Sequence, residues 1–179
     1  MELSEKSDSP DARLTCNINL AEFYRRTRRF EKAKTHIYRA ISISKKEKIT
    51  NTNYLIALNN RMAAIMNESG NIDSSIYFSN KAIALCRKTN NKMEEARSLN
   101  EIGLAFKQSN KLDSAIHSYQ LAEHIWRSLD DFDDAALALN NRAMVYSENG
   151  FPDRQILKIN LVMGILIQKV KIEIKTNTL

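Results

Sequence analysis

The sequence predicts an all-α fold, an α-solenoid of stacked antiparallel helix pairs, and three observations lead to this prediction. Residues 67–76 align without gaps on residues 107–116, and these align on residues 147–156, so the chain repeats with a period of 40 residues. Apolar residues recur at helical spacing between short polar turns. Only four Gly and two Pro interrupt the 179 residues, too few for a fold with many turns. One repeat alone cannot bury its apolar face, so the repeats are expected to stack.

We expect a flexible N-terminal segment at 1–12, a domain of about four helix pairs at 13–168 and a tail at 169–179. The four pairs are placed at 13–48, 51–90, 91–130 and 131–168. The expected helices are 13–27 and 30–44, 51–67 and 72–88, 92–108 and 112–128, and 132–148 and 152–168. The first helix of each pair is called the leading helix below, and the second is called the trailing helix.

The turn within each pair is predicted to hold one residue in the left-handed conformation, which Gly and Asn tolerate. These residues are Gly70, Asn110 and Gly150, whereas the first pair has Arg28 at this place. An aspartate follows three residues later and is expected to cap the trailing helix. The aspartates are Asp73, Asp113 and Asp153.

Small residues recur in the leading helices where the two helices of a pair would cross closely. They are Ala21, Ala63, Gly103 and Ala143. A large side chain there would push the helices apart, at a cost of ~1–3 kcal/mol. These positions are therefore predicted to lie in the core.

Residues 99–106 (LNEIGLAF), 112–122 (LDSAIHSYQLA) and 139–146 (LNNRAMVY) resemble the tetratricopeptide repeat family. The resemblance extends over residues 13–160, and the 40-residue spacing is similar to the longer-period branch that includes kinesin light chains, Rap-type bacterial response regulators and Bacteroidetes sensors. It implies a right-handed superhelix whose concave groove binds peptides or protein segments. The fourth pair departs from the pattern, because Gln155 and Val162 replace small residues.

Asn60, Asn100 and Asn140 are 40 residues apart in the second turn of three leading helices. Asn is unfavourable inside a helix by ~0.5 kcal/mol relative to Ala, so a shared role is expected. In the family that the chain resembles, this turn faces the groove, and the Asn amides hold the backbone of a bound peptide. The alternative is an Asn ladder that bonds neighbouring helices and keeps the stack in register.

Helical spacing adds further groove candidates to the asparagine series. They are Arg25, Arg61, Arg97, Lys107, Asn141 and Met144. Of the basic residues on this face, four could pair with carboxylates of a ligand: Arg25, Arg26, Arg97 and Lys107. The full Lys/Asn/Arg set that clamps a C-terminal carboxylate in some members of the family is not evident.

Charge is unevenly distributed along the chain, which has a net charge of +6. Residues 13–48 contain eleven Lys or Arg against three Asp or Glu, and residues 120–150 contain two against six. This asymmetry could steer an acidic partner to the first pair. The alternative is a solvated helix face.

No motif for catalysis or for a cofactor stands out. The chain lacks a Gly-rich phosphate loop, HExxH and GxSxG, and His117 and His124 have no further ligand at metal-site spacing. Basic and aromatic residues interleave at 23–30, but the aromatics fall at core positions, so nucleic-acid binding is not expected. We therefore expect no enzyme activity, no metal and no cofactor.

No signal peptide and no membrane span is expected, since Lys158 and Lys169 interrupt the most apolar stretch. Cys16 and Cys86 are read as reduced thiols, and a cytoplasmic location is expected. The residues thus predict a non-enzymatic interaction module that binds a protein or peptide segment in a concave groove. The alternatives are a scaffold that forms homo-oligomers through its apolar C-terminal stretch, or a regulatory segment of a larger bacterial sensor or transcription regulator.

Overall fold

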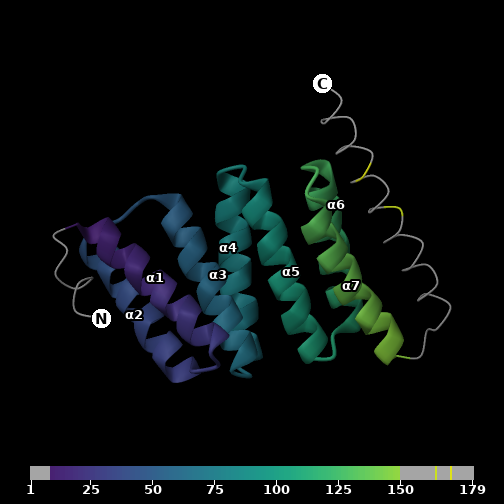
Figure 1. The fold of residues 1–179 in the computed structure, drawn as a ribbon, viewed down its shortest axis with the longest axis horizontal. Coiled ribbons are helices and arrows are strands. Elements are labelled where there is room, and N and C mark those ends of the chain that lie inside the picture. Colours follow the sequence, from purple (N-terminus) through teal and green to yellow (C-terminus); the bar gives the residue numbers. More distant parts are fainter. Residues whose placement is uncertain (1–8, 150–163, 165–169, 171–179) are drawn as a thin grey trace. The chain divides into compact units, whose positions relative to one another are not determined.

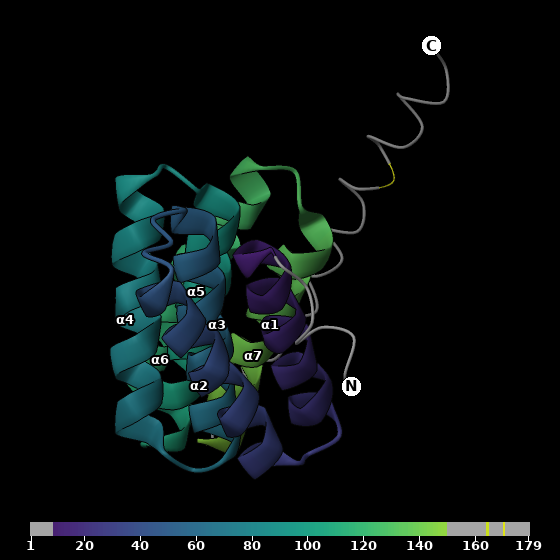
Figure 2. The ribbon, with the colours of Figure 1, turned by 90° about the vertical axis from the view of Figure 1, so that its left-hand side faces the viewer.

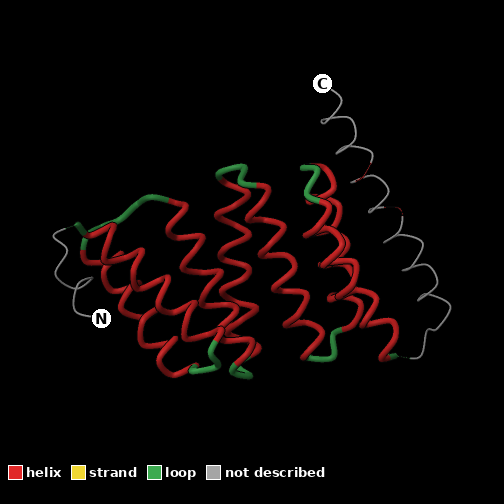
Figure 3. Tube along the Cα trace, in the orientation of Figure 1, coloured by secondary structure: helices red, strands yellow, loops and turns green. Residues whose placement is uncertain are grey.

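The computed structural model describes residues 9–149 together with Gly164 and Val170. Within residues 9–149 all regular secondary structure is helical, and short loops join successive helices (Figure 3). The helices are α1 (Pro10–Arg26), α2 (Phe30–Lys46), α3 (Thr52–Glu68), α4 (Ile72–Lys88), α5 (Lys92–Gln108), α6 (Leu112–Ser128) and α7 (Phe132–Glu148). This part of the chain is an all-α solenoid of adjacent helix pairs, as the sequence predicts (Figure 1).

Several expectations fall outside the described residues. They concern the first eight residues, the left-handed turn at Gly150, the cap at Asp153, and the trailing helix at 152–168 with its substitutions at Gln155 and Val162. The proposed oligomer contact of the C-terminal stretch and the tail at 169–179 also fall there, Val170 excepted.

The chain forms two compact units, Met1–Glu94 and Glu95–Leu179. In the first unit α1 packs against α2, α3 packs against α4, and both α1 and α2 contact α3 (Figures 1 and 2). The core of this unit is formed by residues of α1, α2 and α3 that are fully or almost fully buried. The core residues are Leu14, Ile18, Ala21, Ala33, Ile37, Ala40, Leu58, Met62, Ile65 and Met66.

In the second unit α6 packs against α7, and a core cluster contains the buried residues Ala115, Tyr119 and Val145. The ring of Tyr119 lies against the backbone of Gly103 on α5. A Cβ atom at residue 103 would lie 2.7 Å from Tyr119 Cε1, closer than real contacts allow. The predicted close crossing at Gly103 is therefore confirmed, and it exists because this residue has no side chain.

Four of the helices, α4 to α7, begin and end at the residues that the sequence predicts. The first helix differs, because it begins at Pro10 rather than Arg13. Ser9 is its N-cap, and the Ser9 hydroxyl accepts a hydrogen bond from the Ala12 N–H. Proline suits the first position of a helix, since its missing N–H would have no partner there. Residues 10–12, expected in the flexible segment, are thus helical.

The predicted left-handed turn residues are confirmed at Gly70 (φ 81°) and Asn110 (φ 58°). Arg28, which replaces the glycine in the first pair, adopts the same conformation with φ 57°. The residue after each of them closes the turn, as in the N–H of Asn71, which donates to Met66 O at 2.8 Å. This 6→1 bond is the usual way to end a helix with a left-handed residue.

The prediction that Asp73 and Asp113 cap the trailing helices is wrong. The N-cap residues are Asn71 and Lys111, neither of which makes a side-chain cap hydrogen bond, and the aspartates occupy the first helical turn. The turn closes one residue after the left-handed position, so the helix begins before the aspartate. The carboxylates can still interact favourably with the positive end of the helix dipole.

None of the helices in the described part of the chain has the length and apolar character needed to cross a membrane.

Candidate functional site

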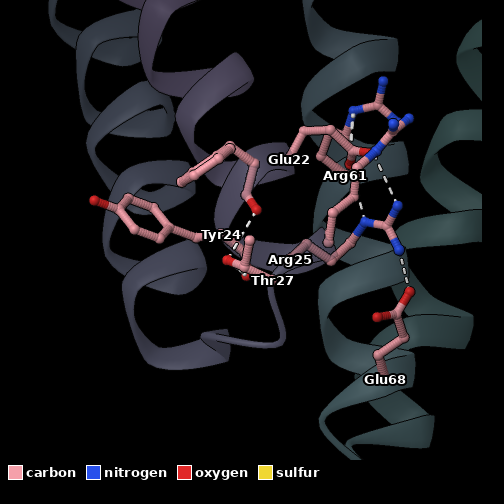
Figure 4. Close-up of polar contacts among 8 residues, drawn as sticks. Glu22, Tyr24, Arg25, Thr27, Arg61 and Glu68 are labelled. Carbon is pink, nitrogen blue, oxygen red and sulfur yellow. Dashed lines mark hydrogen bonds and ion pairs between the residues drawn. The ribbon is translucent and has the colours of Figure 1, made fainter.

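The leading helices α1 and α3 of the first unit are joined by a cluster of charged side chains (Figure 4). Arg25 on α1 donates through Nη1 to Glu68 on α3, 43 residues along the chain. The same guanidinium donates two hydrogen bonds to Glu22, from Nε to Oε2 at 2.9 Å and from Nη2 to Oε1 at 2.8 Å. Arg26 adds a bond from Nε to Glu22 Oε1 at 2.7 Å. Arg25 therefore ties consecutive repeats together.

Glu22 is the centre of this cluster, and only 14% of its side chain is exposed. The hydrogen bonds from Arg25 are the largest influence on its pKa, with help from Arg26 and Arg61 and against the effect of burial. Together they lower the pKa of Glu22 to about 2. The pKa of Arg25 is raised in return. The Glu22 carboxylate is thus ionised at neutral pH, and its negative charge is compensated by the surrounding arginines.

Arg61 on α3 completes the cluster from the opposite side. Its Nε lies 3.6 Å from Glu22 Oε2, within ion-pair range but too far for a hydrogen bond, and 43% of the side chain is exposed. This Nε is buried and makes no hydrogen bond in the described structure. The cluster places three guanidinium groups around two carboxylates, Glu22 and Glu68. An unused donor and one surplus positive charge therefore remain at Arg61.

An open hollow of about 750 Å³ lies along α1, from Asp11 to Phe23. Its lining is mostly apolar and combines one face of α1 with Tyr54 at the start of α3. The lining residues are Asp11, Ala12, Thr15, Cys16, Asn19, Leu20, Phe23 and Tyr54. Asn19 lies one helical turn before Glu22, so the hollow and the charged cluster adjoin along α1.

The leading helices α5 and α7 of the second unit repeat the link between helices. Lys107 Nζ on α5 lies 2.8 Å from Glu148 Oε1 on α7. The Asn141 Nδ2 donates to Asn100 Oδ1 at 3.0 Å, and Asn100 is only 6% exposed. Two of the predicted groove residues, Asn100 and Asn141, are thus in contact with each other rather than free.

Three other candidates in the second unit lie at the surface. Asn140 is exposed, and its Nδ2 lies 4.0 Å from the sulfur of Met144 one turn later. Met144 is 43% exposed. Arg97 is exposed on α5 and interacts with the charge of Asp134. These three side chains are accessible on the leading helices of this unit.

The asparagine series is equally spaced in the sequence but not equivalent in its surroundings. Asn60 is 8% exposed, and its Nδ2 donates to Glu94 Oε2 at 3.0 Å. Asn60 and Asn100 are therefore buried hydrogen-bonding residues, whereas Asn140 faces solvent. Their geometry is compatible with a ladder between neighbouring helices at the first two positions, and a role in binding stays a proposal.

Sequence reasoning placed the cations of this surface among its candidates but missed two carboxylates, Glu68, which pairs with Arg25, and Glu94, which accepts a hydrogen bond from Asn60. A signal was present, because Arg25 and Glu68 are 43 residues apart and Lys107 and Glu148 are 41 apart. Opposite charges separated by about one repeat on successive leading helices are expected to meet. The hollow lined by Phe23 and Tyr54 had no such signal, since it depends on how α1 and α3 are set against each other.

In the range 9–149, no group of three or more His, Cys, Asp or Glu side chains is arranged to hold a metal ion.

Comparison with solved structures finds proteins of the same fold. BtubC (BKLC) from P. vanneervenii matches with a TM-score of 0.79 and 18% identity, over 92% of this chain and 68% of that one. A Podosopora anserina protein described as a kinesin light chain with nearly identical TPR-like repeats has a TM-score of 0.69 and 17% identity, over 95% of this chain and 79% of that one. At these identities the likeness shows the fold alone. Comparison with curated proteins gives no match.

Two family models match this chain, and both describe the tetratricopeptide repeat. One matches residues 53–128 and the other matches residues 14–47, so that together they extend over more than half of the 179 residues. The matched residues include the leading helices α1, α3 and α5 and their trailing partners. The chain belongs to the tetratricopeptide repeat family.

Proposed function

We propose that this chain is a non-enzymatic interaction module that binds an extended peptide or protein segment on the surface of its leading helices. Tetratricopeptide repeats generally mediate protein–protein interaction, which supports the general role. The single observation that supports the location is the pairing of an open hollow with the partly exposed Arg61 guanidinium on α1 and α3. The hollow beside Phe23 and Tyr54 suits an apolar side chain, and the exposed part of the Arg61 guanidinium suits a carbonyl or carboxylate oxygen.

The second unit adds a matching surface of its own. Asn140 offers an exposed amide that can donate and accept at once, which suits the backbone of an extended chain of any sequence. Met144, one turn later, offers a flexible apolar contact that adapts to different side chains. Arg97 and Lys107 contribute positive charge, Lys107 through a pair with Glu148 that a ligand carboxylate would have to compete for.

The test begins with peptides selected from a random library on the immobilised wild-type chain. Two double variants then remove exposed leading-helix groups, Arg61→Gln with Phe23→Ala in the first unit and Asn140→Ala with Met144→Ala in the second. The matched control removes two exposed side chains from the trailing helix α6, Gln120→Ala with His124→Ala.

We expect at least one leading-helix variant to lose about tenfold or more in affinity, since a few anchoring residues dominate most interfaces. The α6 control is expected to bind as the wild type does. Equal losses in all three variants, or a loss confined to the control, would place the binding surface elsewhere. Circular dichroism of each variant shows whether the fold is retained.

A further inference from the structure

The turn between α1 and α2 carries a concentration of positive charge away from the surface described above. Arg28, Arg29 and Lys32, called the basic turn here, are all exposed, and Arg26, which is bound to Glu22, lies beside them. They occupy the end of α1 and the beginning of α2, so they lie at one end of the first helix pair. The turn is thus a separate surface with its own chemistry.

The carboxylates near the basic turn are already engaged. Glu22 is bound by Arg25 and Arg26. Glu31, the one acidic residue between positions 26 and 32, pairs with Lys34 at 3.1 Å. Within the described residues, no ion pair is made by Arg28, Arg29 or Lys32. Their charge therefore has no ion-pair partner among residues 9–149.

Aromatic rings hold two of these cations in place. The Arg28 guanidinium carbon lies 5.7 Å from the centre of the Phe30 ring, and Lys32 Nζ lies 5.7 Å from that of Tyr24. The Tyr24 ring is also stacked on His36 at 5.3 Å. Such contacts order the cations while leaving their donors unused. Arg28 thus covers one face of the Phe30 ring, and Lys32 and His36 both contact the Tyr24 ring, so the two rings are poor platforms for nucleic-acid bases.

The backbone at Arg28 gives an independent indication. Arg28 is left-handed with φ 57°, a conformation that an L side chain adopts at a cost. The equivalent positions of the next two pairs hold Gly70 and Asn110, which adopt it more readily. Lys48 and Asp130 are also left-handed, with φ 50° and 58°, so the replacement of Gly or Asn within a helix pair, and not the strain alone, distinguishes Arg28.

We propose that the basic turn is a docking surface for an acidic protein segment, one rich in Asp and Glu side chains. Arginine forks match carboxylates in bidentate geometry, and three unpaired cations within five residues can bind several carboxylates of a flexible segment. The cations of the basic turn contact the rings of Tyr24 and Phe30, and the exposed ring of Phe23 lines the hollow beside α1 instead, which favours a polypeptide over a nucleic acid. Binding of this kind is steered by charge and weakens as salt screens it.

The experiment uses the full chain and three labelled probes measured by fluorescence anisotropy. The probes are a peptide of alternating Glu and Ser, the same peptide with Gln for Glu, and an oligothymidine. We expect the Glu peptide to bind, with an affinity that falls as sodium chloride is added, and the Gln peptide not to bind. No binding of the Glu peptide, or tighter binding of oligothymidine, would overturn the proposal.

A charge-matched pair of variants locates the surface. The triple variant Arg28→Gln, Arg29→Gln, Lys32→Gln is expected to lose about tenfold or more in affinity for the Glu peptide. The control Lys45→Gln, Lys46→Gln, Lys48→Gln removes the same charge from the opposite end of α2 and is expected to lose less than about threefold. Equal losses would mean that net charge, and not this surface, attracts the peptide.

The single variant Arg28→Gly separates docking from folding. Glycine relieves the left-handed backbone, so the melting temperature should rise, while the affinity for the Glu peptide should fall. The control Asn110→Gly should also raise the melting temperature and leave the affinity unchanged. Unchanged affinity of the Arg28→Gly variant for the Glu peptide would show that Arg28 does not take part in docking. Library peptides that bind the leading helices should bind the triple variant normally, so this proposal and the proposed function fail separately.

Discussion

Lys107 and Glu148 join α5 to α7 by an ion pair of 2.8 Å, and Arg25 and Glu68 make the same link between α1 and α3 two repeats earlier. In both cases a cation near the end of one leading helix reaches a carboxylate at the end of the next. Asn67 and Gln108 stand at the equivalent positions of α3 and α5, so the ion pair occurs in each unit but is not a fixed part of the repeat.

The two links are predicted to differ in strength. In the second unit the Glu148 side chain is 53% exposed, so a double-mutant cycle of Lys107→Gln and Glu148→Gln should give a coupling of about 0.3–1 kcal/mol. Arg25→Gln should cost more, about 1–3 kcal/mol, because it strips the main donor from Glu22. Urea unfolding of the variants measures both. A larger cost at Lys107 than at Arg25 would contradict this ranking.

The lowered pKa of Glu22 predicts a dependence of stability on pH. Its folded-state value of about 2 lies below the ordinary value of 4.5, so ionised Glu22 stabilises the fold above about pH 5. That contribution should be lost as pH falls through the interval from 4.5 to about 2. The variant Glu22→Gln should be less stable than wild type at neutral pH and should approach it near pH 2. A difference that stays constant over this interval would show that Glu22 keeps an ordinary pKa.

The contact of Gly103 with Tyr119 predicts that the effect of Gly103→Ala on stability depends on the residue at position 119. Gly103→Ala should destabilise the protein by ~1–3 kcal/mol, because the new Cβ would lie 2.7 Å from the ring and force it to move. In a Tyr119→Ala background the same change should be neutral or stabilising by up to ~1 kcal/mol, since Ala is the better helix former. Denaturant unfolding of the four proteins tests this. Equal costs in both backgrounds would mean that the ring is not the obstacle.

The asparagine series predicts unequal outcomes from equal substitutions. Asn100→Ala should lower the free energy of unfolding by about 1–2 kcal/mol, because Asn100 is buried and bonded to Asn141. Asn140→Ala should change it by less than ~0.5 kcal/mol, because Asn140 is exposed. Thermal unfolding measures both. A strong destabilisation by Asn140→Ala would instead assign it a structural role.

Much of the fold could be predicted from the sequence because each repeat encodes the same two helices and the same turn. Helical spacing and turn residues set the bounds of α4 to α7 without error, and Gly103 marked a close crossing. The start of α1 was missed because it depends on the local cap at Ser9, outside the repeating pattern. The caps at Asp73 and Asp113 were misplaced because the 6→1 bond, not the aspartate, decides where the trailing helix begins.

The candidate surface was predictable only in part, for a physical reason. Periodicity says which residues share a helix face, but not how far one helix slides along the next. That offset decides that Arg25 reaches Glu68 and that Asn141 reaches Asn100. Equal spacing in the sequence therefore did not mean an equal role in the structure.

The measurement that tests the proposed function most directly is NMR mapping of a library-selected peptide on the isotope-labelled chain. The account predicts that amide shifts change along the leading helices, at residues such as Asn19 and Arg61 or Asn140 and Met144, while α2, α4 and α6 change little. Shifts concentrated on the trailing helices, with Arg61 and Asn140 unaffected, would contradict it.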